Sequence, residues 1–205
     1  MRIHRVILPL SLCLLVCISP TQASAQSQIG AVVGATFSTL RGIDGLDSRT
    51  GVMGGLSLVM GGPLALQTGL LFASKGAEGE TSGRDGLQLD YVEVPLLLRL
   101  GLGSGSGVTP HIYAGPYFGF QINCTVEGTD ADCDDLPNVS TNSVDIGGII
   151  GAGLDFGVGP LVLTGGLRYG FGVSKVADFE IGSVRESAKN GSFAIYAGLG
   201  IKLGR

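Results

Sequence analysis

The sequence predicts an all-β protein that folds as an eight-stranded antiparallel up-and-down transmembrane β-barrel. Three observations predict this class. First, large apolar residues alternate with small or polar ones through most of the chain, the pattern of strands with two different faces. Second, short and long connections follow one another in strict succession. Third, glycine supplies 36 of the 205 residues, against an average of about 7%, while only 15% of the residues are charged.

Residues 1–25 predict a signal peptide that is cleaved on export. A basic start, MRIHR, precedes the apolar run VILPLSLCLLVCIS, and an A-x-A cleavage signal stands at 23–25. The mature chain, 26–205, is then expected to be a single barrel domain that begins at Gln26. No later segment has about 18 uninterrupted apolar residues, so no transmembrane helix is predicted.

Eight segments of the mature chain are predicted to be strands, each near the roughly 10 residues that a transmembrane β-strand needs. The first two segments alternate only weakly. In each of the others, one parity is apolar and the opposite parity is mostly small, polar or charged. In order, the segments are 29–39, 52–60, 64–75, 89–103, 111–122, 144–156, 161–173 and 192–203.

The apolar parity of the third strand and of the last four strands is expected to form one continuous face. Large residues recur there at alternate positions, with glycine, alanine or a polar residue between them. These large residues are Leu64, Leu66, Leu70, Phe72, Ile112, Phe118, Phe120, Ile122, Val144, Ile146, Ile150, Leu154, Phe156, Leu161, Leu163, Leu167, Tyr169, Phe171, Val173, Phe193, Ile195, Leu199, Ile201 and Leu203.

The fourth strand, LDYVEVPLLLRLGLG, contains charges within an apolar run. Its even-numbered positions from Val92 onward are all Val or Leu, whereas the odd ones include Glu93, Pro95 and Arg99. Pro95 removes one ladder hydrogen bond and is a candidate β-bulge. A bulge there would reverse the direction in which Arg99 points.

The connections indicate which strands are neighbours. Short turns are expected at 61–63, 103–107 and 158–160. Longer polar links, which hold most of the remaining charges, are expected near 40–51, 76–87, 123–143 and 174–191. This alternation is typical of an up-and-down barrel with turns at one end and loops at the other, and an even strand count brings both termini to the turn end.

The polar faces of the strands indicate which side of the barrel faces outward. A soluble barrel would carry many lysines and glutamates on its outer face. Here the non-apolar face is mostly Gly, Ala, Ser and Thr, which suits the narrow lumen of an eight-stranded barrel. The apolar face then belongs against lipid, and closure of the barrel satisfies every backbone hydrogen bond. We therefore expect a protein of the bacterial outer membrane.

The net charge excludes one class of partner. The formal charge is −4, and loss of Arg2 and Arg5 with the signal peptide takes it to −6. An acidic chain without a basic stripe is a poor candidate for binding nucleic acid.

The expected partners are outer-membrane lipid and lipopolysaccharide, the barrel assembly machinery and a protein partner that contacts the loops.

Several stretches resemble a known family: GATFSTLRG, LQTGLLFASKGAE, LDYVEVPLLLRLGL, PHIYAGPYFGF, GAGLDFGVGPLVLTGGLRYGFG and FAIYAGLGIKL. They are similar to the outer-membrane β-barrel-domain family often labelled porin-family or PorT-like. The resemblance covers nearly the whole mature chain and implies a small outer-membrane barrel without an assigned activity. Because the chain has no Trp, its interfacial girdle is expected to consist of Tyr and Phe.

Two cysteines remain in the mature chain, Cys124 and Cys133, within a polar acidic segment. A disulfide is the favoured interpretation for an exported protein, and two free thiols are the alternative. The same segment places Asp130, Asp132 and Asp134 at the first three carboxylate positions of a calcium loop. The turn glycine and the bidentate Glu are missing, so these are weak metal candidates, and a solvated acidic loop is favoured. No cofactor is predicted.

Seven charges fall on the lumen parity of the strands, and five of them define the candidate site. We assign a lumen ionic network to Glu93, Arg99, Asp155, Arg168 and Lys202. These residues either line a conducting pore or form a packed ionic plug. The plug is favoured, because open aqueous channels typically have about 16 or more strands.

Three functions remain open. The first is a non-enzymatic barrel that anchors exposed loops for structural or interaction roles, and the second is a narrow channel for small solutes. The third, a lipid-modifying enzyme, would need a nucleophile and a base in reach of each other. Only His111 is available as a mature-chain histidine, and an ordinary lumen or rim position is its favoured role. No catalytic residue is therefore predicted.

Overall fold

The computed structural model describes most of the chain beyond the predicted signal peptide, which lies outside the described residues. The described ranges are 27–41, 46–79, 86–103, 107–126, 131–132, 139–141, 143–174, 177–181 and 184–203. No helix in these ranges is long and apolar enough to cross a membrane.

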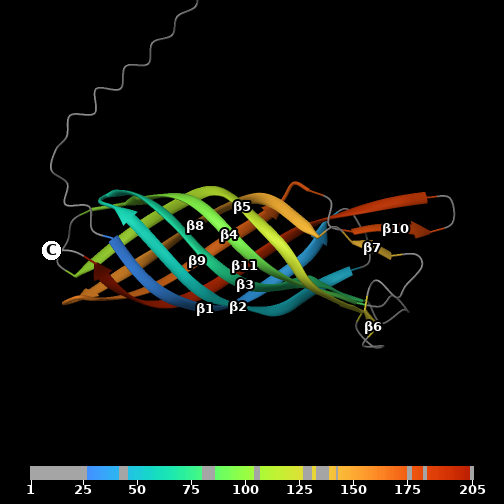
Figure 1. The fold of residues 1–205 in the computed structure, drawn as a ribbon, viewed down its shortest axis with the longest axis horizontal. Helices are drawn as coiled ribbons and strands as arrows, with labels where there is room; N and C mark the ends of the chain where they lie inside the picture. Colours follow the sequence, from blue (N-terminus) through green and yellow to red (C-terminus); the bar gives the residue numbers. More distant parts are fainter. Residues whose placement is uncertain are drawn as a thin grey trace, which may run out of the picture.

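Eight long strands form a closed antiparallel barrel (Figure 1), which confirms the predicted fold class. Each strand pairs with the next long strand along the chain, and β1 pairs with β11 to close the barrel. The strands are β1 (Ser27–Arg41), β2 (Leu46–Gly61), β3 (Leu64–Gly79), β4 (Leu87–Gly101), β5 (Val108–Val126), β8 (Val144–Val158), β9 (Leu161–Gly172) and β11 (Val184–Leu203).

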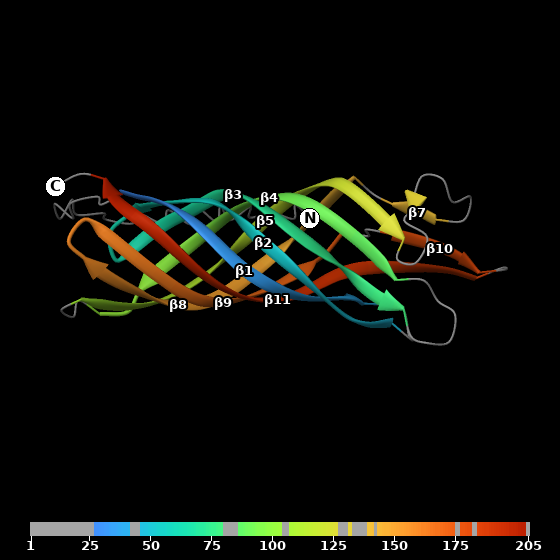
Figure 2. The same cartoon turned by 90° about the horizontal axis from the view of Figure 1, so that it is seen from below.

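Most strands are longer than the sequence pattern indicated, above all β11 with 20 residues, whereas β4 has the predicted length of 15 residues and β9, with 12, is one residue shorter. Three short strands, β6 (Ala131–Asp132), β7 (Val139–Thr141) and β10 (Ala177–Ile181), lie within the expected long links. The expected polar link at 174–191 contains a β-hairpin, in which β10 pairs with the first residues of β11. This hairpin extends the sheet at the loop end of the barrel (Figure 2).

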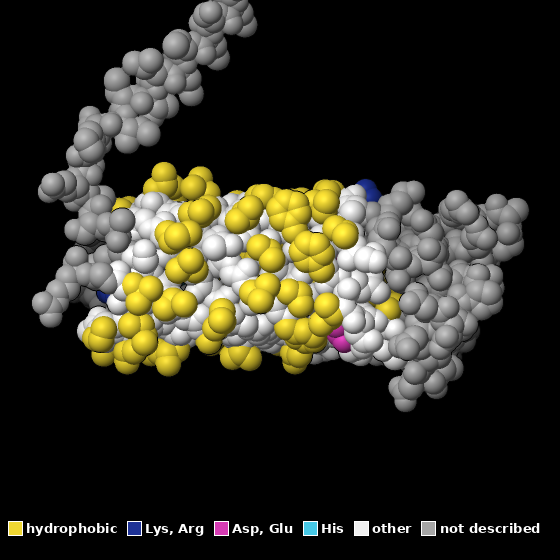
Figure 3. Space-filling view, viewed as in Figure 1, with side chains coloured by type: hydrophobic (Ala, Val, Ile, Leu, Met, Phe, Trp, Pro, Cys, Tyr) yellow, Lys and Arg dark blue, Asp and Glu magenta, His cyan; other side chains and the backbone are white. Residues whose placement is uncertain are grey.

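The outer surface of the barrel is apolar (Figure 3). The large residues of the predicted outward parity are exposed, except for the half-buried Phe171, and Leu64 and Leu98 are each 59% accessible. The opposite parity points inward, where Tyr91 and Glu93 are fully buried. The predicted facing of the strands is therefore confirmed.

β4 keeps its alternation on both sides of Pro95. Its pairing with β5 runs from Tyr91↔Gln121 through Pro95↔Tyr117 to Arg99↔Tyr113 without a change of register. The irregularity lies instead between Asp90 and Tyr91. The prediction of a bulge at Pro95 was thus wrong, and Arg99 points into the lumen as the simple alternation requires.

The three short connections lie at one end of the barrel, together with the ends of β1 and β11 (Figure 1). β8 and β9 are joined by Gly159-Pro160 alone. Gly159 has φ of +61°, a left-handed conformation that glycine adopts without steric cost. We call this end the turn end and the opposite end the loop end.

Exposed aromatic side chains gather toward the loop end. Phe37 pairs with Phe193, and Phe193 pairs with Tyr169, so three neighbouring strands carry an aromatic ring at paired positions. Phe72, Phe118 and Phe120 add exposed rings in the loop-side halves of β3 and β5. Among the described exposed aromatics, Phe156 alone lies close to the turn end. The expected girdle of Tyr and Phe is present, but it is one-sided.

Candidate functional site

Four buried charges form a cluster in the loop-side half of the lumen. We call Lys75, Glu93, Asp145 and Arg168 the central ion cluster. Lys75 Nζ lies 2.5 Å from Glu93 Oε1 and 3.4 Å from Asp145 Oδ2. Arg168 Nη2 donates to Glu93 Oε2 at 2.6 Å. Two cations therefore face two carboxylates, so the cluster is formally neutral.

Polar and aromatic side chains complete the coordination of Asp145. Tyr117 Oη and Asn190 Nδ2 each donate to Asp145 Oδ2 at 2.8 Å, and Ser174 Oγ donates to Oδ1 at 3.1 Å. The Lys75 ammonium lies 4.5 Å from the centre of the Tyr117 ring, a cation–π distance. Buried charges are stable when paired and hydrogen-bonded in this way.

The alternation of the strands explains how these groups meet. Lys75, Glu93, Asp145 and Arg168 lie on β3, β4, β8 and β9, each on the inward parity. Glu93 and Asp145 both pair with Gly119 of β5. A Cβ at Gly119 would lie 3.4 Å from the Asp145 Cβ, so a glycine there leaves room for the two carboxylates on either side.

A second polar cluster lies nearer the turn end. Arg99 forms an ion pair with Asp155, and its Nη2 lies 3.0 Å from His111 Nδ1. Thr164 Oγ1 donates to Asp155 Oδ1 at 2.8 Å. Because a guanidinium only donates, Nδ1 of His111 must accept, which leaves the ring neutral with its proton on Nε2. We call Arg99, His111 and Asp155 the turn-side cluster.

An aromatic and apolar layer separates the two clusters. Tyr113 Oη donates to Tyr196 Oη at 3.1 Å across the lumen. Buried apolar side chains pack around these rings, including Met53, Leu71 and Leu97. Sequence reasoning expected a lumen of small residues and charges, and it missed this packed layer.

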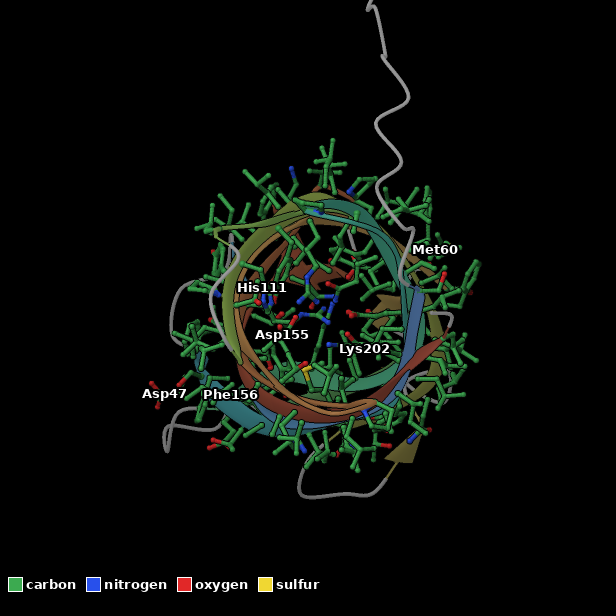
Figure 4. The ribbon with its side chains drawn as sticks, turned by 90° about the vertical axis from the view of Figure 1, so that its left-hand side faces the viewer. Asp47, Met60, His111, Asp155, Phe156 and Lys202 are labelled. Carbon is green, nitrogen blue, oxygen red and sulfur yellow. The ribbon has the colours of Figure 1, made fainter. Side chains whose placement is uncertain are left out.

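A cavity of about 780 Å³ occupies the turn end of the lumen. Arg99, His111 and Asp155 line it together with Thr109 and Lys202. Figure 4 views the barrel from this end and shows His111, Asp155 and Lys202 inside the ring of strands, while Phe156 and Met60 point outward.

The structure brings together four of the five residues assigned to the lumen network, as two separate pairs. Glu93 contacts Arg168, and Arg99 contacts Asp155. Lys202 does not join them, since it has no ion-pair partner among the described side chains. The expectation of one network that includes Lys202 was therefore wrong. The alternation of a strand predicts whether a side chain faces the lumen, but not how far along the barrel axis it lies. Lys202 faces the lumen at the mouth of the barrel, too near the turn end to join the other charges.

Sequence reasoning left several residues out of the site. Lys75 and Asp145 were recognised as lumen charges but not assigned to the network. Tyr117, Asn190 and His111 also contribute. Lys75, Asp145, Tyr117 and His111 all lie on the lumen parity of their strands. The alternation of the sequence could therefore have identified these four residues.

Other predicted site residues lie at the edge of what the structure describes. Cys124 is buried near the end of β5, and Cys133 lies outside the described residues, so the disulfide stays a prediction. The side chains of Asp130, Asp132 and Asp134 are likewise not described. Among described residues, no group of His, Cys, Asp or Glu is arranged to hold a metal ion.

The model of the outer membrane protein beta-barrel domain family matches residues 22–178, which is most of the chain. The chain belongs to this family. It is therefore an outer membrane β-barrel protein, as its apolar exterior predicted, whereas the narrower PorT-like label stays a prediction. In outer-membrane barrels the short turns face the periplasm and the longer loops face the outside. The turn-end cavity is accordingly periplasmic.

Two solved structures support the fold. The crystal structure of the outer membrane protein OprG from Pseudomonas aeruginosa is 12% identical, with a TM-score of 0.55, and the match covers 88% of this chain and 97% of that one. A major outer membrane protein from Thermus thermophilus is 16% identical, with a TM-score of 0.53, covering 88% of this chain and 100% of that one. No relative was found among curated proteins.

Proposed function

We propose that the protein is a closed, non-enzymatic membrane anchor that presents its loop-end segments outside the cell. The observation that carries this proposal is the central ion cluster. Together with Tyr117 and Asn190, its four charges join side chains of six of the eight barrel strands across the lumen. Groups held from so many strands leave no continuous aqueous path at that height.

The middle of the lumen supports the same conclusion. The Tyr113–Tyr196 layer directly follows the central ion cluster, and the cavity beside these rings has a volume of only about 30 Å³. That is room for about two or three water molecules. A narrow channel for small solutes, the alternative function, would require both layers to move apart.

The arrangement of His111 supports a non-enzymatic role. Its Nδ1 faces Arg99, and the hydroxyl of Thr164, beside the turn-side cluster, donates to Asp155 instead of to the imidazole. A nucleophile needs its base within hydrogen-bond reach, and these two groups are not so placed. Incubation of the purified barrel with phospholipid or lipopolysaccharide is expected to leave the lipid unchanged. Hydrolysed or transferred acyl chains would contradict the proposal.

Conductance across a planar bilayer tests whether the lumen is closed. The refolded wild-type protein is expected to give no sustained current steps, because the central ion cluster and the tyrosine layer obstruct the path. Steps that appear in the wild type and change in amplitude in Glu93→Ala or Arg99→Ala would show that these groups line a pore, and the anchor proposal would fail. Glu78→Ala, at an exposed position of β3, is the matched control.

Shortening the β10–β11 hairpin tests whether the loop end is separable from the barrel. Ala177–Ile181 pairs with Val184–Ala188 at the start of β11 and, in part, with β7, and neither segment pairs with another barrel strand. Replacing 177–188 with a short turn is therefore expected to leave the heat-dependent mobility shift on a detergent gel unchanged. Loss of that shift would show that the hairpin is part of the folding unit instead of a presented segment.

A further inference from the structure

The turn-end cavity has a net positive charge and a volume that is usual for a small-molecule binding site. Its lining contains two cations, Arg99 and Lys202, but one carboxylate, Asp155. Arg99 and Asp155 neutralise each other as an ion pair, so the cavity keeps an excess charge of +1 on Lys202. Its volume of about 780 Å³ lies within the range of about 300–1,000 Å³ that is usual for small-molecule sites.

Lys202 is held inside the barrel instead of pointing into solvent or lipid. A Cβ built on Gly157 would lie 3.4 Å from Lys202 Nζ, which places the ammonium against the inner wall near the β8–β9 turn. A side chain at position 157 would occupy that space. Since lysine has three donors and no acceptor, and no described carboxylate pairs with it, its charge is available to a ligand.

The other polar groups of the cavity fit the same ligand chemistry. Asp155 is already occupied by Arg99 and Thr164, so it offers little to a cation. His111 Nε2 is buried against β8, 2.7 Å from where a Cβ on Gly153 would lie, so it is not presented to the cavity. Among the charged groups of the cavity wall, Lys202 is therefore the one that has no ion-pair partner in the described structure.

We propose that the turn-end cavity binds a small organic or inorganic oxyanion, a carboxylate or a phosphate, that enters from the periplasm. Lys202 supplies the charge that attracts the anion, and the Arg99–Asp155 pair forms the floor that stops it. Confinement between low-dielectric walls strengthens the field of a single cation, and a bond between ammonium and oxyanion is stronger than a neutral hydrogen bond. This site is independent of whether the lumen conducts.

Nuclear magnetic resonance titration of the refolded mature chain in detergent micelles tests the proposal. The two probes are benzoate and inorganic phosphate, added at constant ionic strength. Saturable shifts are expected for the amides of Gly101 and Gly157, which line the cavity, and not for Gly54 on the outer face. Saturation by either probe supports the site and assigns its preferred oxyanion, whereas the absence of saturable shifts with both overturns it.

Two substitutions on β11 provide the matched comparison. Lys202→Gln is expected to weaken binding about tenfold or more, the loss of one charge-assisted hydrogen bond. Lys189→Gln removes the same charge from an exposed position at the other end of the strand and is expected to bind like the wild type. Equal binding by Lys202→Gln and the wild type would overturn the proposal. If Lys202→Gln does not fold, Lys202→Arg keeps the charge, and its failure to bind while folded would equally overturn it.

Discussion

Glu93→Gln is expected to lower the free energy of unfolding by about 3–5 kcal/mol, the usual cost of removing one partner of a buried ion pair. Glu93 is the only carboxylate that contacts both Lys75 and Arg168 in the described structure, and its side chain is fully buried. The amide leaves Arg168 without a counter-ion and Lys75 with the more distant Asp145 alone. The measurement is the urea midpoint of the barrel refolded in phospholipid vesicles.

Two variants distinguish loss of ion pairing from a general effect of the amide. Glu78→Gln makes the same change at an exposed position of β3 and is expected to stay within about 0.5 kcal/mol of the wild type. Combining Glu93→Gln with Arg168→Met removes one unpaired cation and is expected to recover part of the loss. A Glu93→Gln barrel as stable as the wild type would show that the cluster contributes nothing to stability.

Gly166→Ala is expected to destabilise the barrel by about 1–3 kcal/mol, the cost of overpacking a close-packed interior. Gly166 lies on the inward face of β9, where an added Cβ would meet Tyr196 Oη at 2.6 Å and Ala152 O at 2.8 Å. Tyr196 cannot retreat without losing its hydrogen bond with Tyr113. The methyl group therefore displaces a ring that packs in the lumen.

The adjacent glycine offers a control of the same chemistry. Gly165 points outward, and a Cβ there would have no atom within 4 Å. Gly165→Ala is expected to be about 0.4–1 kcal/mol more stable than the wild type, since alanine restricts the unfolded chain. Both variants are compared by urea unfolding in the same vesicles. If both destabilise equally, the loss arises from the strand backbone and not from the lumen packing.

The barrel could be predicted from the sequence because the same apolar alternation recurs in many segments. The apolar parity recurs in segment after segment, and a slip of one residue would turn every side chain of a strand to the wrong face. That redundancy also placed Glu93, Arg99 and Arg168 in the lumen before any coordinates were known. The bulge predicted at Pro95 is absent, because the loss of one backbone N–H donor did not outweigh the regular pairing with β5 on both sides of the proline.

The partners within the lumen could not be predicted in the same way. Lys75 and Asp145 are 70 residues apart, and their meeting depends on the stagger between strands, which parity does not encode. For the same reason, the sequence predicted correctly that Lys202 faces the lumen, but not its position along the barrel axis. Strand ends were also underestimated, because β10 has only five residues and the first residues of β11 are mostly polar.

The one-sided aromatic girdle has a consequence for how the barrel sits in membranes of different thickness. Aromatic rings prefer the interface between headgroups and acyl chains, and here they lie near the loop end, which faces the outer leaflet. The lipopolysaccharide side should thus fix the depth of the molecule. A thinner or thicker bilayer would then be accommodated at the periplasmic rim, where aliphatic residues such as Leu64 and Leu161 meet the short turns.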